Sequence, residues 1–190
     1  MSFSLKYGCT KKMEEENVKP LIAYYSRKGQ NLVNGCVREL QVGNTEVLAC
    51  ILQKLTGGEC LKMEPVQDYP KDYYRCINAA REDLLAHRLP ELKNLPESLE
   101  VYDVVYLGYP NYWGTIPMPV ASFLKGFDFS GKHIRPFCTH EGGGLGSSLG
   151  DIRSLCPRAI VEPGIAIRGS EIKQDLADFG AWACGKQKGV

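Results

Sequence analysis

Hydroxyl and amide side chains that could bind a phosphate group lie at both ends of a long loop near the start of the chain. Ser26 follows an apolar run, and Gly43, Asn44 and Thr45 come just before an amphipathic segment. The N-terminus of a helix presents unpaired N–H groups and a partial positive charge, which suits a phosphate. No lysine follows in the Walker arrangement, so the loop is not of the nucleoside triphosphate type. The same residues also fit a hydrophilic loop followed by a capped helix.

Two further loops contain residue types that suit a flat ligand. Tyr112 and Trp113 lie on a turn between Pro110 and Pro117. Exposed aromatic rings are costly there unless they cover something flat and apolar, either a ligand or a neighbouring helix. The third loop, 139–148, is rich in glycine, which lets the backbone approach a ligand closely. Together the three loops predict a phosphate at one end, a flat ring in the middle, and backbone N–H groups around the polar edge of that ring.

The elements that would position these loops alternate between strands and helices. Apolar runs predict strands at Leu21–Tyr25, Glu59–Glu64, Asp103–Tyr109, His133–Thr139 and Ala159–Ile165. Amphipathic segments predict helices at Thr45–Thr56, Asp72–Ala86, Pro117–Gly126, Gly146–Leu155 and Glu171–Cys184, the first of them capped by Asn44. This alternation predicts a doubly wound α/β fold. In such a fold ligands bind beyond the carboxyl ends of the strands, where the three loops begin.

Three stretches of the chain resemble the flavodoxin-like family, and in particular flavodoxin variants with a long first (phosphate) loop. They read YYSR…VGNTEVLA, LGYPNYWGTIPMPV and FSGKHIRPFCTHEGGGLGSSLGDIRSLCP, and the resemblance extends from Pro20 to Trp182. It implies a five-stranded parallel sheet of order 2-1-3-4-5 with helices on both faces. It also implies that FMN is bound non-covalently.

The resemblance further implies a role for each loop. Ser26, Asn44 and Thr45 would bind the phosphate, with Gly43 at the turn and Arg27 close enough to reach it. Tyr112 and Trp113 would flank the isoalloxazine, and the loop beginning at Thr139 would face its pyrimidine edge. The full set of cofactor-binding candidates is Ser26, Arg27, Gly43, Asn44, Thr45, Pro110, Asn111, Tyr112, Trp113, Gly114, Thr115, Thr139, His140, Glu141, Gly142, Gly143, Gly144 and Gly146.

The residues between Ser26 and Gly43 look like an insertion into a phosphate loop that is compact in shorter relatives. We expect residues 27–42 to fold outward as a small hairpin that turns near Asn34-Gly35, because Asn-Gly is a strong hairpin signal. The phosphate would then lie between Ser26 and the helix start at Asn44-Thr45.

The composition is that of an ordinary globular protein, with 190 residues of which 44% are hydrophobic and 24% charged. We expect one domain at 20–190 after a polar extension at 1–19. The net charge of +1 gives no reason to expect nucleic acid or a membrane as partner. No apolar run approaches the roughly 18 residues that span a bilayer. The N-terminus lacks the apolar stretch of a secretory signal, and none of the eight cysteines forms a C-x-x-C pair. These features predict a cytoplasmic protein whose thiols lie mostly in the core.

Two other functions, hydrolase and phospho-acceptor receiver domain, are excluded because the residues that they require are not at the required positions. Ser148 lies in a G-x-S-x-G pattern, but about nine residues separate it from the predicted strand end, and His87, His133 and His140 all precede it. The hydrolase elbow needs its serine directly after a strand and its histidine later in the chain. A phospho-acceptor receiver domain would need carboxylates at the ends of the first and third strands, which read Tyr-Tyr-Ser and Gly-Tyr-Pro.

Two functions remain. The first is a flavodoxin-type carrier of single electrons between redox protein partners, and the alternative is an NAD(P)H-dependent FMN quinone or flavin reductase with a small acceptor. In both, FMN carries the redox chemistry, so no side chain need act as a catalytic nucleophile or metal ligand. The G-x-G-x-x-G fingerprint of a dinucleotide site is missing after the first strand, which favours FMN over FAD and favours the carrier. Carrier flavodoxins are usually strongly acidic, and this nearly neutral chain departs from that pattern.

Overall fold

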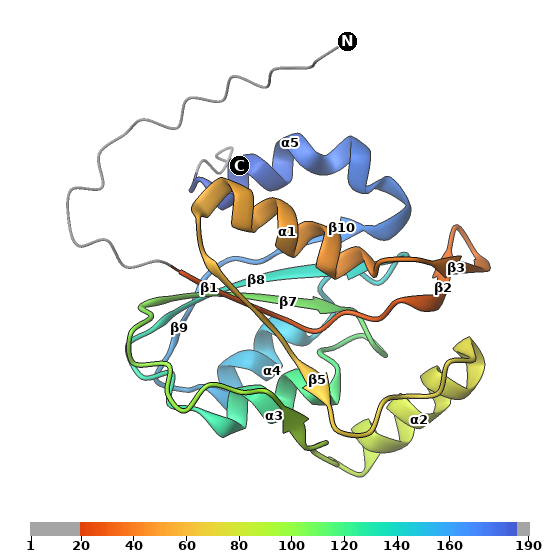
Figure 1. Ribbon diagram of the computed structural model, residues 1–190, viewed down its shortest axis with the longest axis horizontal. Coiled ribbons are helices and arrows are strands. Elements are labelled where there is room, and N and C mark those ends of the chain that lie inside the picture. The colour runs from red at the N-terminus through yellow and green to blue at the C-terminus, as the bar shows by residue number, and fades with distance from the viewer. Residues whose placement is uncertain (1–19, 186–190) are drawn as a thin grey trace.

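A parallel sheet forms the centre of the molecule. The computed structural model describes residues 20–185. Strands β1 (Leu21–Tyr24), β4 (Glu59–Lys62), β7 (Val104–Pro110), β8 (His133–His140) and β10 (Ile165–Arg168) pair in the order β4-β1-β7-β8-β10. Numbered along the chain, this is 2-1-3-4-5, so the predicted flavodoxin-like topology is confirmed (Figure 1). A two-residue strand, β9 (Ile160–Val161), pairs with the beginning of β8.

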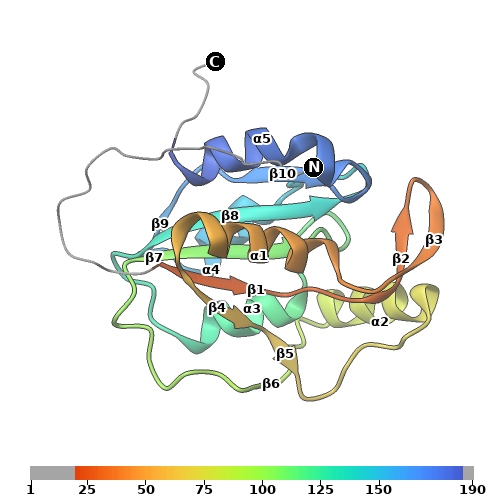
Figure 2. The same ribbon diagram turned by 45° about the horizontal axis from the view of Figure 1, so that its top comes forward.

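Helices cover both faces of the sheet. Helices α1 (Asn44–Thr56) and α5 (Ile172–Ala183) lie on one face, and α3 (Met118–Gly126) and α4 (Ser148–Leu155) lie on the other, with α2 (Tyr73–Leu85) beside α3 (Figures 1 and 2). Alternate residues of β1 enter different cores, because successive side chains of a strand point to opposite faces. Leu21 and Ala23 pack toward α3, whereas Ile22 and Tyr24 pack toward α1 and α5.

The predicted fifth strand, Ala159–Ile165, is wrong in its bounds. The structure has only Ile160–Val161 there, and the main pairing with β8 runs over Ile165–Arg168. Pro163 and Gly164 lie between the two strands. Proline has no N–H to donate to a ladder, so pairing resumes only after it.

Each helix starts one or two residues from its predicted position, and two of these differences lie at the loops of interest. Helix α1 begins at Asn44 with Gly43 in the capping position, so Asn44 is the first helical residue and not the cap. Helix α4 begins at Ser148, two residues later than predicted. Gly146 has φ +54, a left-handed conformation that cannot belong to an α-helix.

The insertion forms a hairpin of β2 (Gly29–Val33) and β3 (Cys36–Leu40). The turn predicted at Asn34-Gly35 is confirmed, since both residues have positive φ, 49° and 76°. The hairpin stands out from the edge of the domain (Figure 2), as predicted, but it also contacts the site, which the prediction did not include. Asn31 and Leu32 line a cavity of the domain, and the tip is hydrogen-bonded to Glu141. Two more strands, β5 (Glu64–Pro65) and β6 (Leu92–Lys93), and a 3₁₀ turn, η1 (Gly169–Glu171), complete the described elements.

The cysteines are less buried than predicted. Cys76, Cys138 and Cys156 are buried, and Cys60 is half-buried, but Cys36, Cys50 and Cys184 are exposed. Cys9 and the extension predicted at 1–19 lie outside the described residues. In residues 20–185 no helix is long and apolar enough to cross a membrane.

The sheet makes a direct stability prediction at Gly108 on β7. A Cβ atom at this position would lie 2.2 Å from Cζ of Phe137, whose ring covers it. We expect Gly108→Ala to lower the free energy of unfolding by about 1–3 kcal/mol, because the packed ring must shift. Urea titration measures the change, and Gly126→Ala, which meets open space at the end of α3, is the control. Equal effects of the two substitutions would contradict the proposed packing.

Candidate functional site

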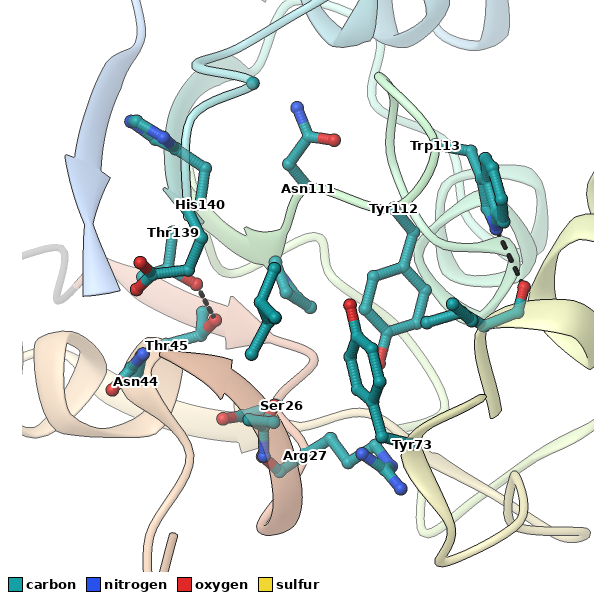
Figure 3. Close-up of a pocket in the computed structure, with 16 residues that line it drawn as sticks. Ser26, Arg27, Asn44, Thr45, Tyr73, Asn111, Tyr112, Trp113, Thr139 and His140 are labelled. Atoms are coloured by element: carbon teal, nitrogen blue, oxygen red, sulfur yellow. Dashed lines mark hydrogen bonds between the residues drawn. The ribbon is translucent and has the colours of Figure 1, made fainter. Parts of the chain in front are cut away.

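A cavity of about 300 Å³ lies at the carboxyl ends of the central strands. Its lining comprises Ser26, Arg27, Asn31, Leu32, Asn44, Thr45, Tyr73, Ile77, Pro110, Asn111, Tyr112, Trp113, Thr139, His140, Glu141 and Gly143. The structure therefore brings together residues from all three loops singled out in the sequence. Figure 3 shows the hydroxyl and amide groups of Ser26, Asn44 and Thr45 across the cavity from the rings of Tyr73, Tyr112 and Trp113.

Six of the predicted residues do not line the cavity. They are Gly43, Gly114, Thr115, Gly142, Gly144 and Gly146. Four lining residues were missed, namely Asn31, Leu32, Tyr73 and Ile77. Tyr73 and Ile77 are four residues apart, a spacing that places them on the same face of α2. That spacing could have grouped the two residues, but nothing in the sequence places α2 beside the aromatic turn.

The polar end is built around the start of α1. The backbone N–H of Glu46 donates to Oγ of Ser26 over 3.1 Å, and that of Val47 donates to the carbonyl of Gly43 over 3.1 Å. The N–H groups of Asn44 and Thr45 therefore remain as the first donors of the helix. A Cβ at Gly43 would lie 2.2 Å from Ser26 Oγ, so only glycine permits this close approach.

Thr45 and Thr139 connect the helix start to the end of β8. Their hydroxyl oxygens lie 2.8 Å apart, and the residues are only 1% and 4% exposed. One hydroxyl donates to the other, which leaves the second hydroxyl hydrogen available for another acceptor. Main-chain N–H groups and neutral hydroxyls at a helix N-terminus are donors that suit a phosphate monoester.

The guanidinium of Arg27 is engaged in hydrogen bonds to main-chain carbonyls. It donates to Pro70 over 2.9 Å, to Lys71 over 2.5 Å, and also to Gln30. In Figure 3 it lies beside Tyr73, on the aromatic side of the cavity. Arg27 therefore connects the base of the hairpin to the segment at Pro70 and Lys71. The guanidinium could contact a phosphate only if these hydrogen bonds were broken.

The two predicted aromatic residues face different surroundings. The Tyr112 ring packs edge-on against Tyr25, with centroids 6.2 Å apart. Burial raises the pKa of the Tyr112 phenol well above its ordinary value, so it stays protonated. Trp113 is 48% exposed, its indole N–H donates to the Ile77 carbonyl over 2.8 Å, and the guanidinium of Arg81 lies 5.0 Å from its ring centroid.

The aromatic turn has an unusual backbone. Trp113 and Gly114 have φ of 55° and 83°, and reciprocal backbone hydrogen bonds between Tyr112 and Thr115 close the turn. Positive φ is rare for a bulky residue and persists only when the surroundings enforce it. Asn111 does so, since its Oδ1 accepts from the Gly114 N–H and its Nδ2 donates to the Gly144 carbonyl, over 2.9 and 2.8 Å.

The glycine-rich loop packs directly on this turn. A Cβ at Gly146 would lie 2.0 Å from the carbonyl oxygen of Gly114. Nearby, Nδ1 of His140 accepts from the Gly142 N–H over 2.9 Å, which assigns the proton of the neutral ring to Nε2. Burial lowers the pKa of His140, and the positive charge of Arg168 lowers it further. Residues 20–185 contain no group of three or more His, Cys, Asp or Glu that could hold a metal ion.

Comparison with known proteins agrees with this geometry. A sequence model of the family described as Flavodoxin matches residues 40–182. The chain belongs to the flavodoxin family. The match begins at the last residue of β3, so most of the hairpin lies outside it. The search of curated proteins found no match.

Solved structures show the same fold. A candidate flavoprotein from Bacteroides uniformis ATCC 8492 is 21% identical, with a TM-score of 0.68 over 88% of this chain and 98% of that one. A second, from Bacteroides eggerthii DSM 20697, is 25% identical, with a TM-score of 0.66 over 86% and 98%. A flavoprotein from Lactobacillus acidophilus NCFM, in complex with FMN, is 20% identical, with a TM-score of 0.60 over 82% and 97%.

The contact between the two loops can be tested with a matched pair of glycines. Gly144 and Gly146 both have positive φ, 57° and 54°, but a Cβ at Gly144 meets nothing within 4 Å. Both alanine variants therefore carry the same backbone strain, and only Gly146→Ala adds a steric clash. We expect Gly146→Ala to lower the free energy of unfolding by about 1–3 kcal/mol more than Gly144→Ala does. Thermal or urea unfolding measures this difference, and a difference near zero would mean that the loops are not in contact.

Proposed function

We propose that this protein binds FMN in the cavity and carries electrons between redox partners. The observation that carries the proposal is that, within one cavity, a helix start with hydroxyl donors faces a group of aromatic rings. Such an arrangement suits a ligand with a phosphate at one end and a flat ring at the other. Membership of the flavodoxin family supports FMN as that ligand, and the Lactobacillus acidophilus relative is an FMN complex.

In this proposal the phosphate is held by neutral donors at the start of α1. Ser26 and the N–H groups of Asn44 and Thr45 lie there, and the partial positive charge of the helix N-terminus replaces a lysine. The chain needs no strongly basic patch for this purpose, which is consistent with its net charge of +1.

The ring is held by the aromatic turn and by the loop after β8. Tyr112 and Trp113 supply flat surfaces, and Asn111 holds the main chain of the turn against that of the glycine-rich loop. When bound, FMN supplies the redox chemistry. The protein positions the ring, keeps water from part of it and sets its electrostatic surroundings.

The state of the titratable groups around the cavity favours a carrier. The Tyr112 phenol is protonated and its ring packs against Tyr25, Nδ1 of His140 accepts from the backbone, and the Glu141 carboxylate accepts from Ser170 and Asn34. Each of these groups therefore has a structural partner. A carrier needs no acid, base or nucleophile from the protein, whereas a reductase must also bind a nicotinamide.

The first experiment identifies the cofactor and the type of redox chemistry. The bound flavin is released by denaturation and measured by mass spectrometry, and the two one-electron potentials are then determined by photoreduction. We expect FMN, two well-separated potentials, and slow consumption of NADH or NADPH in the presence of a quinone. Stoichiometric FAD would refute the cofactor assignment, and rapid NAD(P)H turnover would favour the reductase.

Thr45 allows a sharper test of the phosphate site. Thr45→Val keeps the shape of this buried side chain and removes the hydroxyl, whereas Thr45→Ser keeps the hydroxyl. We expect Thr45→Val to weaken FMN binding by about 1.5–3 kcal/mol, because a donor to a charged group is lost. Thr45→Ser should bind FMN more tightly than Thr45→Val does.

The control for this test lies at the far end of the same helix. The Thr56 hydroxyl donates to the Leu52 carbonyl over 2.9 Å and is remote from the cavity. Thr56→Val should therefore leave the affinity for FMN, measured by fluorescence titration of the apoprotein, unchanged. If Thr45→Val and Thr56→Val have the same effect, the phosphate does not bind at the start of α1.

A further inference from the structure

The hairpin of residues 29–40 is held to the domain in an unusual way. Each residue of β2 is half-buried, and each residue of β3 is half-buried or exposed. A second cavity of about 860 Å³ lies against the root of the hairpin, lined in part by Gly29, Gln30 and Leu40. The hairpin is therefore not anchored by a buried apolar face. Segments with few buried apolar contacts open at low free-energy cost.

Polar contacts at two points hold the hairpin instead. At the root, Oε1 of Gln30 accepts from the Tyr73 N–H over 2.9 Å, and Arg27 donates to Pro70 and Lys71. At the tip, the Asn34 N–H donates to Oε2 of Glu141 over 3.1 Å. In both ribbon views the hairpin stands beside the end of β10 and the following η1 turn (Figures 1 and 2).

The tip contact is the more specific of the two, because Glu141 is itself fixed in place. Its Oε1 accepts from the Ser170 N–H over 2.8 Å, and its Oε2 accepts from the Ser170 hydroxyl over 3.1 Å. Both carboxylate oxygens are thus used, one of them shared with the hairpin. Hydrogen bonds to a charged acceptor are about twice as strong as neutral ones.

The hairpin also forms a wall of the cofactor cavity. Asn31 and Leu32 line that cavity, whereas Gly29 and Gln30 line the second one behind it. Movement of the tip toward the second cavity would break the bond to Glu141 and open the first cavity beside Ser26. The root contacts at Gln30 and Arg27 could act as the pivot.

We infer that the hairpin is a strap across the cofactor cavity, that Glu141 is the positioning residue that latches it, and that FMN enters and leaves when this latch opens. This inference rests on the proposed FMN site. It makes FMN a resident cofactor whose exchange is limited by the strap, and not a substrate that is released in each cycle.

The test compares two substitutions that remove the same charge. Glu141→Gln leaves one acceptor oxygen where two are used, so either Asn34 or Ser170 loses its partner. Glu171→Gln is the control, since Glu171 pairs with Arg168 at 3.3 Å and makes no bond to the hairpin. FMN uptake and release are followed by stopped-flow fluorescence of the full chain. We expect Glu141→Gln to accelerate both rates, by about 10- to 100-fold, and Glu171→Gln to leave them near wild type.

The sign of the effect separates a latch from simple charge repulsion. If Glu141 acted only through its charge, its removal would favour the phosphate dianion and slow the release of FMN. Ser170→Ala, which removes one of the bonds that fix Glu141, should accelerate exchange in the same direction but less strongly. Unchanged or slower release in Glu141→Gln would overturn the inference.

A second measurement needs no cofactor. In the apoprotein, amide hydrogen exchange of residues 29–40 should be faster in Glu141→Gln than in wild type, while the amides of β7 and β8 should be unaffected. Equal protection of the hairpin in the two proteins would refute the latch. If neither the wild type nor the variants bind FMN, hydrogen exchange still tests whether Glu141 holds the hairpin. The absence of FMN binding would then contradict the proposed function and not the role of Glu141.

Discussion

The parallel pairing of β7 with β1 on one side and β8 on the other is the constraint on which the site depends. Tyr24 lies opposite Gly108, and Pro110 lies opposite Thr139. Because the three strands run in the same direction, the loops that follow them begin at the same edge of the sheet. Residues far apart in sequence, such as Thr45, Asn111 and Thr139, thereby come to line one cavity.

Main-chain contact then sets the shape of that edge. Gly43 lets the start of α1 approach Ser26, and Gly146 lets the last loop approach the aromatic turn. Such approaches exclude a Cβ atom, and they bring the N–H groups at the start of α1 to the cavity beside the hydroxyls of Ser26, Thr45 and Thr139. A preorganised backbone suits a phosphate and the polar edge of a ring, and it does so without an excess of positive charge.

The hairpin adds a different kind of element to this rigid frame. The sheet and its helices bury two apolar cores, whereas the hairpin is fixed by hydrogen bonds in which Gln30 accepts from Tyr73 and Asn34 donates to Glu141. A cavity with one wall of this kind can be stable and still exchange its ligand. The match to the family begins only at residue 40, so most of this wall lies outside the matched region.

The sequence by itself determined the class of fold, the order of the strands and twelve of the sixteen lining residues. The class of fold follows from local signals, namely the alternation of apolar runs with amphipathic segments. The order of the strands and the roles of the site residues came from the resemblance of three loop motifs to the flavodoxin-like family. Local signals did not place the fifth strand, because the interruption at Pro163-Gly164 takes effect through pairing with β8. Nor did they predict the contact of the hairpin with the site or the contributions of Tyr73 and Ile77 to the cavity. Those depend on contacts across the fold, such as Asn34 with Glu141 and Trp113 with Ile77, and only the tertiary structure decides which distant surfaces meet.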